Sequence, residues 1–182
     1  LTKGAARRVL KLLPKVDSII IGPGLEAGSE PGIELVVDEA GALGKGMVLD
    51  AGSLYPGVLD HVRGRRAVLT PHAGEFRRVF GAEPPRDLEG RVKLVREYAE
   101  RSRVTILLKG RRDVISNGVE AAVNETGTPA MTAGGTGDVL SGLVAAFLAW
   151  GVEPFEAAAS AAWINGKCGE LAAEKLGLHI IA

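Results

Sequence analysis

Short apolar runs recur along the chain between residues 16 and 109, and each run leads into a turn of glycine or polar residues. The stretches between the runs carry apolar residues at helical spacing. Continuously apolar runs are typical of parallel strands buried on both faces, and their alternation with helices predicts an α/β fold. The predicted strands are Val16–Ile21, Met47–Leu49, Ala67–Leu69 and Val104–Leu108.

Two stretches between these strands have the spacing of amphipathic helices. They are Ile33–Ala42 and Leu88–Ser102, and Asp87 is a candidate N-cap for the second. After the fourth strand, Asp113–Ser116 and Val119–Val123 flank Asn117-Gly118, which is a strong hairpin signal. The sheet is therefore expected to be mostly parallel, with an antiparallel hairpin at its edge.

The last part of the chain is predicted to be helical. One helix runs from Asp138 to Trp150, and a long alanine-rich helix starts at Pro154 and stops at Gly177. The final residues, 178–182, resume an apolar, strand-like pattern, and the chain opens at Leu1. We expect one domain over residues 1–182, incomplete at both ends.

Composition narrows the classes of partner. Lysine plus arginine (22) balance aspartate plus glutamate (22), so no net field favours nucleic acid or an anionic membrane. No apolar run approaches the ~20 residues of a membrane helix, which predicts a soluble, cytoplasmic protein. The single cysteine, Cys168, lies among alanines and is predicted to be a buried filler in a reducing compartment.

The most informative segment is glycine-rich and precedes a helix. Gly134, Gly135, Thr136 and Gly137 can point backbone N–H groups into one concavity, and the helix N-terminus adds partial positive charge. This pattern predicts a phosphate-binding loop. Asp138 at its mouth is either a base that accepts the proton of an attacking hydroxyl or an N-cap of the helix. A Walker-type loop is disfavoured, since no Gly-Lys-Ser/Thr follows.

Residues just after the predicted strands should share one edge of the sheet, where open parallel sheets bind ligands. Gly24, Asp50, His72 and Lys109 occupy such positions. His72 either contacts a substrate or caps the short helix to Phe80. Asp50 binds a substrate or magnesium, or it only caps a turn.

The segment Lys109-Gly110-Arg111-Arg112-Asp113 places cations and a glycine at the end of a buried strand. It fits either contacts to a nucleotide or, for Arg111 and Arg112, solvated surface charge. A zinc site is not indicated, because the three histidines are scattered.

Several of these segments stand in the order found in one enzyme family. The chain resembles the ADP/ATP-dependent NAD(P)H-hydrate dehydratases of the ribokinase-like superfamily in Ile21–Leu25, Val48–Ala51, Leu69–Glu75, Leu107–Gly110 and Met131–Gly142. The segment with Thr70 to Glu75 and the lead-in from Asn124 to Met131 are more specific to the dehydratases, whereas the glycine–aspartate signature belongs to the superfamily. The resemblance implies a three-layer ribokinase-like fold, with helices on both faces of the sheet.

The resemblance also implies an activity, which is repair of the hydrated cofactors NADHX and NADPHX. The S epimer would be phosphorylated by ADP, or by ATP, with Mg²⁺, and phosphate would then be eliminated. Asp138 would be the base. Gly24, His72 and Asp138 would contact the hydrated cofactor, and residues 109–113 with Gly137 would contact the nucleotide.

Other implications concern assembly and alternatives. The family resemblance suggests a homo-oligomer, specifically a tetramer, and an epimerase domain upstream. Glu26 and Gly52 depart from the family, which carries glycine and a second aspartate there.

The alternative within enzymes is a ribokinase-like kinase of a vitamin precursor such as hydroxymethylpyrimidine, thiazole or pyridoxal. The alternative outside enzymes is a nucleotide-binding module without catalysis.

Overall fold

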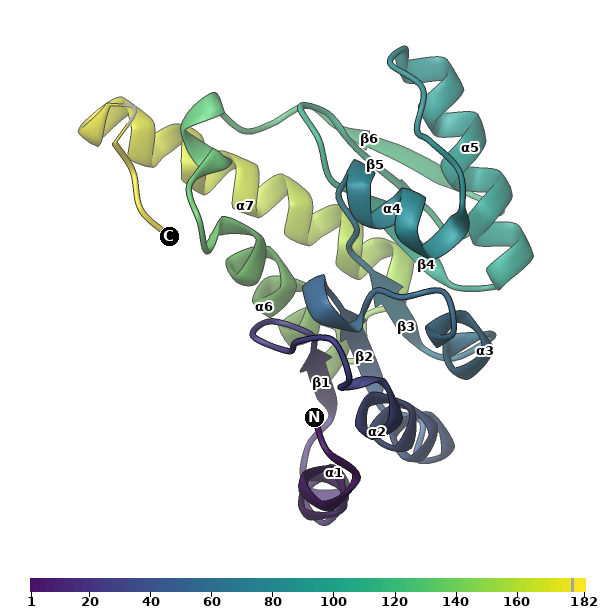
Figure 1. Cartoon of the computed structure of the whole chain (residues 1–182). Coiled ribbons are helices and arrows are strands. Elements are labelled where there is room, and N and C mark those ends of the chain that lie inside the picture. Colours follow the sequence, from purple (N-terminus) through teal and green to yellow (C-terminus); the bar gives the residue numbers. More distant parts are fainter. Residues whose placement is uncertain (178) are drawn as a thin grey trace.

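One six-stranded sheet forms the centre of the computed structural model, which describes residues 1–177 and 179–182 (Figure 1). The strands follow one another across the sheet in chain order, so each strand pairs with its neighbour in sequence. The first four are parallel, and the last two continue antiparallel as a hairpin. Their bounds are β1 Ser18–Ile21, β2 Gly46–Leu49, β3 Ala67–Leu69, β4 Thr105–Leu108, β5 Asp113–Ser116 and β6 Ala121–Asn124.

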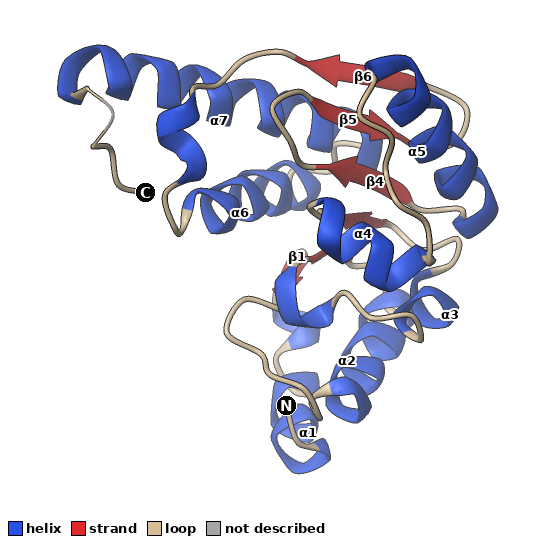
Figure 2. Ribbon diagram, turned by 45° about the horizontal axis from the view of Figure 1, so that its top comes forward, coloured by secondary structure: helices blue, strands red, loops and turns tan. Residues whose placement is uncertain are grey.

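Helices cover both faces of the sheet, as the sequence predicted. Figure 2 shows α6 and α7 on one side of the sheet and α4 and α5 on the other. The helices are α1 Lys3–Leu10, α2 Glu30–Ala42, α3 Val58–Val62, α4 Ala73–Phe80, α5 Leu88–Ser102, α6 Thr136–Ala149 and α7 Pro154–Leu176. Three short 3₁₀ turns join them: η1 Leu13–Lys15, η2 Ala51–Ser53 and η3 Pro129–Thr132.

The core has two layers because successive strand residues point to opposite faces. Met47 and Leu49 pack with α1 to α5, whereas Val48 between them packs with α6 and α7. The same alternation holds in β4, where Leu107 faces α6 and α7. Both faces of the central strands are buried under helices, and apolar residues throughout these strands fit that position.

Most predicted elements are confirmed, with shifts at their ends. β3, β5 and α5 have the predicted bounds, and Asp87 caps α5 by accepting from the N–H of Gly90 at 2.7 Å. β1 starts two residues later than predicted because the N–H of Val16 closes the turn η1. The second hairpin strand, predicted from Val119, starts at Ala121, since the Asn117 side chain accepts the N–H groups of Val119 and Glu120.

The prediction that Cys168 is buried is wrong, because its side chain is exposed. α7 buries a stripe of small residues at helical spacing, namely Ala157, Ala158, Ala161, Ala162, Gly166 and Gly169. Cys168 lies outside that stripe. At the C-terminus, residues 179–182 form no strand, and residue 178 lies outside the described residues.

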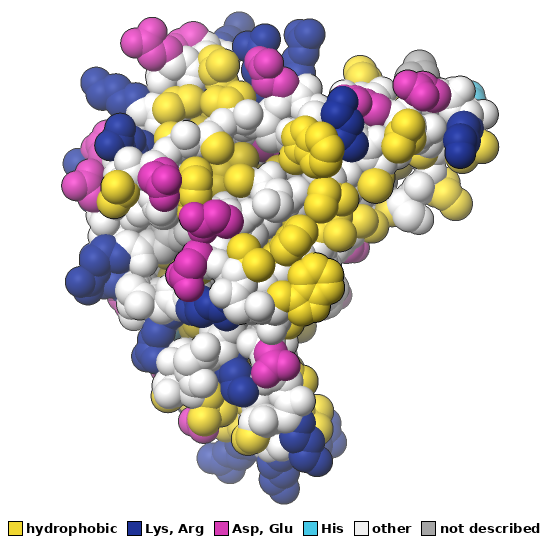
Figure 3. Space-filling model, turned by 180° about the vertical axis from the view of Figure 1, so that it is seen from behind, with side chains coloured by type: hydrophobic (Ala, Val, Ile, Leu, Met, Phe, Trp, Pro, Cys, Tyr) yellow, Lys and Arg dark blue, Asp and Glu magenta, His cyan; other side chains and the backbone are white. Residues whose placement is uncertain are grey.

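Several large apolar side chains remain on the outside of α6 and α7. Val139 on α6, Trp150 just after α6 and Trp163 on α7 are 44%, 77% and 55% exposed. Figure 3 shows hydrophobic side chains gathered on the face seen from behind. No helix among residues 1–177 and 179–182 is long and apolar enough to cross a membrane.

Candidate functional site

The carboxyl ends of β1 to β4 bring the predicted residues to one edge of the sheet. Asp50 follows β2, His72 follows β3 with two residues between, and Lys109 follows β4. The loop after β1 packs directly on the loop after β2, since a Cβ on Gly22 would lie 1.6 Å from the Asp50 carbonyl oxygen. Gly24 is in this first loop, at φ 74° with open space beside it.

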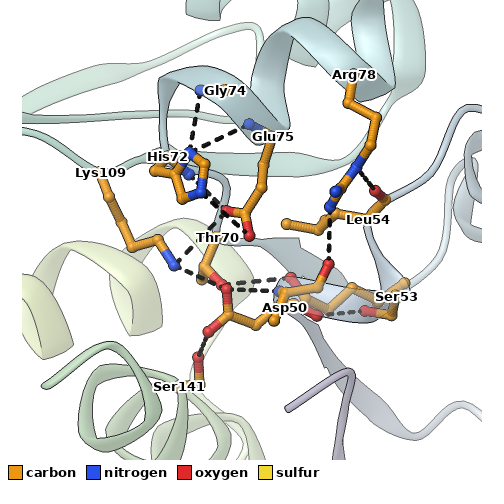
Figure 4. Close-up of polar contacts among 12 residues, drawn as sticks. Asp50, Ser53, Leu54, Thr70, His72, Gly74, Glu75, Arg78, Lys109 and Ser141 are labelled. Atoms are coloured by element: carbon orange, nitrogen blue, oxygen red, sulfur yellow. Dashed lines mark hydrogen bonds and ion pairs between the residues drawn. The ribbon is translucent and has the colours of Figure 1, made fainter. Parts of the chain in front are cut away.

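Asp50 is buried, and both of its carboxylate oxygens have hydrogen-bond partners (Figure 4). Its Oδ1 accepts from the N–H of Ala51 at 2.9 Å and lies 2.8 Å from the Lys109 Nζ. Its Oδ2 accepts from the Ser141 hydroxyl on α6 at 2.9 Å. Asp50 therefore caps the turn η2, as one alternative expected, and it also forms a buried ion pair.

His72 begins α4 with a capping box. Its Nδ1 accepts from the N–H groups of Gly74 and Glu75 at 3.0 and 3.2 Å, and a Glu75 oxygen accepts from the His72 N–H at 2.8 Å. Because Nδ1 accepts, the proton of the neutral ring belongs on Nε2. The ring is 60% exposed, so His72 caps the helix and still presents this N–H near the solvent.

Glu75 lies between His72 and the Asp50–Lys109 pair and contacts both. One of its carboxylate oxygens lies 3.5 Å from the His72 Nε2, and the other lies 3.9 Å from the Lys109 Nζ. The Glu75 side chain is 9% exposed. Asp50, Glu75 and Lys109 thus form a mostly buried cluster of charges at the edge of the sheet.

The glycine-rich loop leads into α6, and Gly135 and Thr136 set its shape. Gly135 is the N-cap at φ 94°, a backbone conformation that favours glycine. The Thr136 hydroxyl donates to the carbonyls of Met131 and Ala133, which ties the loop to its lead-in. The N–H groups of Thr136, Gly137 and Asp138 are in the first turn, where no intrahelical acceptor exists.

Asp138 is the third residue of α6. The N-cap of this helix is Gly135, so Asp138 does not have the capping role that was its alternative. Its side chain is exposed and makes no hydrogen bond or ion pair within the described part of the chain. Gly137 lies beside the charge cluster, since a Cβ there would be 3.6 Å from the Lys109 Nζ.

A cleft of about 890 Å³ opens beside this loop. It is lined by Lys109–Asp113, by Asn124–Pro129, Met131 and Thr132 of the lead-in, and by Thr136, Gly137 and Leu140 of α6. Ala162, Asn165 and Gly166 of α7 form another part of the lining. The α7 residues were missed by the sequence analysis, because a small-residue helix gives no signal of which face borders a cleft.

Asp113 and Asn124 join the two sides of the cleft. Asp113 accepts from the N–H of Gly110 and from the Asn124 amide, each at 3.0 Å. Burial raises the pKa of Asp113, although both of these donors oppose the change. The Asn124 amide also donates to the Ala162 carbonyl at 3.2 Å, so it holds α7 against the hairpin.

Arg111 and Arg112 fit both of the roles considered for them, which are contact with a nucleotide and solvated surface charge. Arg111 and Arg112 are exposed, and both line the cleft. Arg112 pairs with Glu125 at 3.0 Å, and this pair is open to solvent. No group of three or more histidine, cysteine or acidic side chains that could hold a metal ion occurs in residues 1–177 and 179–182.

Comparison with known proteins decides the family. The chain matches the family model described as NAD(P)H-hydrate dehydratase over residues 1–182. The chain belongs to the NAD(P)H-hydrate dehydratase family. The ADP-dependent (S)-NAD(P)H-hydrate dehydratase of Cenarchaeum symbiosum is 47% identical over 183 residues, covering 100% of this chain and 64% of that relative.

A second relative supports the same family, and two solved structures support the fold. The bifunctional NAD(P)H-hydrate repair enzyme Nnr of Pyrobaculum aerophilum is 51% identical, covering 96% of this chain and 35% of its own length. The ADP/ATP-dependent dehydratase of Bacillus subtilis, crystallised with ATP and Mg²⁺, superimposes with a TM-score of 0.78 at 29% identity, covering 95% and 64% of the two chains. A hydroxyethylthiazole kinase from Pyrococcus horikoshii gives 0.80 at 25% identity, covering 95% and 72%. The predicted ribokinase-like fold and family are confirmed.

Proposed function

We propose that this dehydratase-family chain carries out ADP-dependent dehydration of the S epimer of NADHX and NADPHX. The arrangement that supports this most is the exposed Asp138 carboxylate, which has no hydrogen-bond or ion-pair partner among the described residues. It follows Gly137, which lines the cleft and lies beside the Lys109 ammonium. The cleft takes the nucleotide, and the edge with Gly24 and His72 takes the hydrated cofactor. The chain spans 64% of the length of its Cenarchaeum relative, so the activity is assigned to the complete enzyme.

The chemistry follows from the leaving group. Hydroxide leaves the hydrated ring poorly, whereas phosphate leaves well. Asp138 takes the proton of the ring hydroxyl, whose oxygen attacks the terminal phosphoryl of ADP and releases AMP. The ring nitrogen then donates electrons, the C–O bond breaks, phosphate departs, and a proton leaves the neighbouring carbon, which restores the dihydropyridine.

The first-turn N–H groups of α6, including those of Gly135 to Asp138 that lack intrahelical acceptors, stabilise charge on the phosphoryl oxygens. Mg²⁺ would enter on the phosphates of the nucleotide, since the described residues contain no dedicated three-ligand group. When bound, it neutralises phosphate charge during the transfer.

Assembly and location extend the proposal. The Pyrobaculum relative is bifunctional and this chain covers 35% of its length, which supports a further domain in this protein, the epimerase that the family resemblance implies. A homo-oligomer, with the tetramer as its expected form, and a cytoplasmic location stay predictions.

The test is an incubation of the full-length protein with NADHX, Mg²⁺ and either ADP or ATP, while NADH absorbance and free phosphate are followed. Dehydration yields both signals in equal amounts. In a parallel incubation with hydroxymethylpyrimidine, thiazole or pyridoxal, a vitamin kinase yields a stable phosphorylated product, and it forms no NADH from NADHX. A binding module yields neither, and that result would end the proposal.

A further inference from the structure

The Asp50 side chain joins three segments that are far apart in sequence. Lys109 is 59 positions away and Ser141 is 91 positions away, yet both reach the same carboxylate, at 2.8 and 2.9 Å. The carboxylate is 3% exposed. A buried charge of this kind is costly unless it is paired and hydrogen-bonded, and Asp50 is both.

The Lys109 ammonium is held at the border between the two halves of the site. Besides Asp50, its neighbours are Glu75 at 3.9 Å and the first turn of α6, where a Cβ on Gly137 would be 3.6 Å away. An ammonium has three N–H donors, and Asp50 accepts one of them. Among the described residues no second acceptor lies within hydrogen-bond distance of the Lys109 Nζ, which leaves donors for an anion at the glycine loop.

A lysine side chain is flexible, so a free Lys109 would lose much rotational freedom when it met a phosphoryl group. The contact to Asp50 removes that freedom beforehand. Ser141 fixes the other oxygen of Asp50 from the second turn of α6, the helix that carries the loop. The loop and the lysine are therefore set relative to each other through one carboxylate.

We propose that Asp50 and Ser141 are positioning residues, which hold the Lys109 ammonium against the glycine loop so that it binds the terminal phosphoryl of the nucleotide. The inference rests on the proposed function for the identity of that nucleotide. Asp50 touches neither substrate in this scheme and acts through Lys109.

The rival explanation is that Asp50 only stabilises the fold. Ser53 offers a matched control, because it is another buried serine whose hydroxyl donates to Asp50, but to the backbone oxygen, at 2.9 Å. It donates to the Ile21 carbonyl as well, at 2.8 Å. Loss of either serine hydroxyl removes a buried donor near Asp50, and only loss of Ser141 removes a contact to the carboxylate.

The experiment is a double-mutant cycle with Asp50→Asn and Lys109→Met in the full-length enzyme, with turnover of NADHX measured at saturating ADP. Each single change should lower kcat roughly tenfold to a hundredfold, the range for hydrogen bonds to charged groups. If Asp50 acts through Lys109, adding Asp50→Asn to Lys109→Met lowers kcat no further. Ser141→Ala should lower kcat severalfold and Ser53→Ala should leave it unchanged.

A second measurement does not depend on turnover. Calorimetry with ADP and with AMP, each with Mg²⁺, gives the preference for the terminal phosphoryl. That ratio should fall by about tenfold in Asp50→Asn and in Lys109→Met. Additive effects on kcat, equal effects of the two serine changes, or an unchanged ADP-to-AMP ratio would each overturn the inference.

The failures are distinguishable. If the wild-type enzyme does not convert NADHX, the proposed function fails, and the ADP-to-AMP ratio still decides the role of Asp50. If Asp50→Asn or Lys109→Met does not fold, the comparison of Ser141→Ala with Ser53→Ala decides it.

Discussion

Asp138 combines exposure with the absence of any side-chain partner within the described chain. This combination leaves the carboxylate open to a substrate hydroxyl, because among the described residues no cation or N–H group occupies its oxygens. Asp138→Asn should lower turnover of NADHX at least ~100-fold, in the usual range for a general base, while ADP still binds. Steady-state kinetics and calorimetry on the same preparation check this. Turnover equal to the wild type would refute the role of Asp138.

The capping and substrate roles of His72 can be separated with two substitutions. Asparagine is a good N-cap, so His72→Asn should keep the stability of the protein within about 0.5 kcal/mol, whereas His72→Ala should lose about 1 kcal/mol. Both variants lose the Nε2 donor, and both should raise KM for the hydrated cofactor. Urea unfolding gives the first quantity and kinetics the second. A KM that stays at the wild-type value in His72→Asn would leave capping as its whole role.

Single residues also show how far the sequence could lead. Asp87 as a cap and the strand-end positions of Asp50 and Lys109 follow from local pattern. The pairing of Asp50 with Lys109 and Ser141 does not, because no local rule links positions 59 and 91 residues apart. The exposed position of Cys168 could be inferred only by knowing which face of α7 meets the sheet.

Among the elements, α7 approaches the lead-in loop so closely that glycine is required. A Cβ on Gly166 would lie 2.1 Å from the Oγ1 of Thr126 and 2.7 Å from the carbonyl carbon of Thr126. Gly166→Ala should therefore push the loop and α7 apart, at a cost of about 1–3 kcal/mol of unfolding free energy, and weaken ADP binding. Urea unfolding and calorimetry measure the two effects.

Gly142 in α6 supplies the control for this substitution. It has no atom within 4 Å of its Cβ position, so Gly142→Ala should be neutral or should stabilise the helix by up to about 1 kcal/mol. A loss of stability in Gly142→Ala as large as that in Gly166→Ala would show that close approach is not the cause.

Element types were more predictable than element ends. Hydrophobic pattern defines the middle of a strand, and polar side chains decide where it starts. At the hairpin, the carbonyl of the Asn117 side chain takes the N–H groups of Val119 and Glu120, so these residues join the turn and not β6. Such side-chain competition is visible only once the turn is built.

For the whole molecule, the order of strands could not be obtained from their pattern, because period and length do not specify neighbours. The cleft depends on that order. It places the hairpin beside β4 and lets α7 cross toward it, so that Asn124, which pairs with Asp113 across the hairpin, also donates to the Ala162 carbonyl of α7. The prediction of one domain over residues 1–182 stays a prediction.

This junction should make the stability of the whole molecule depend on pH. Burial raises the pKa of Asp113 above its ordinary value of 3.8, so the folded protein binds this proton more tightly than the unfolded chain. The stabilisation is fully present below pH 3.8 and is lost as the pH rises through the raised pKa. Asp113→Asn has no such proton. The unfolding free energy of the wild type minus that of Asp113→Asn should therefore fall as the pH rises through this window and then level off. Urea unfolding at a series of pH values measures the difference, and a difference that stays constant would show that Asp113 titrates alike in both states.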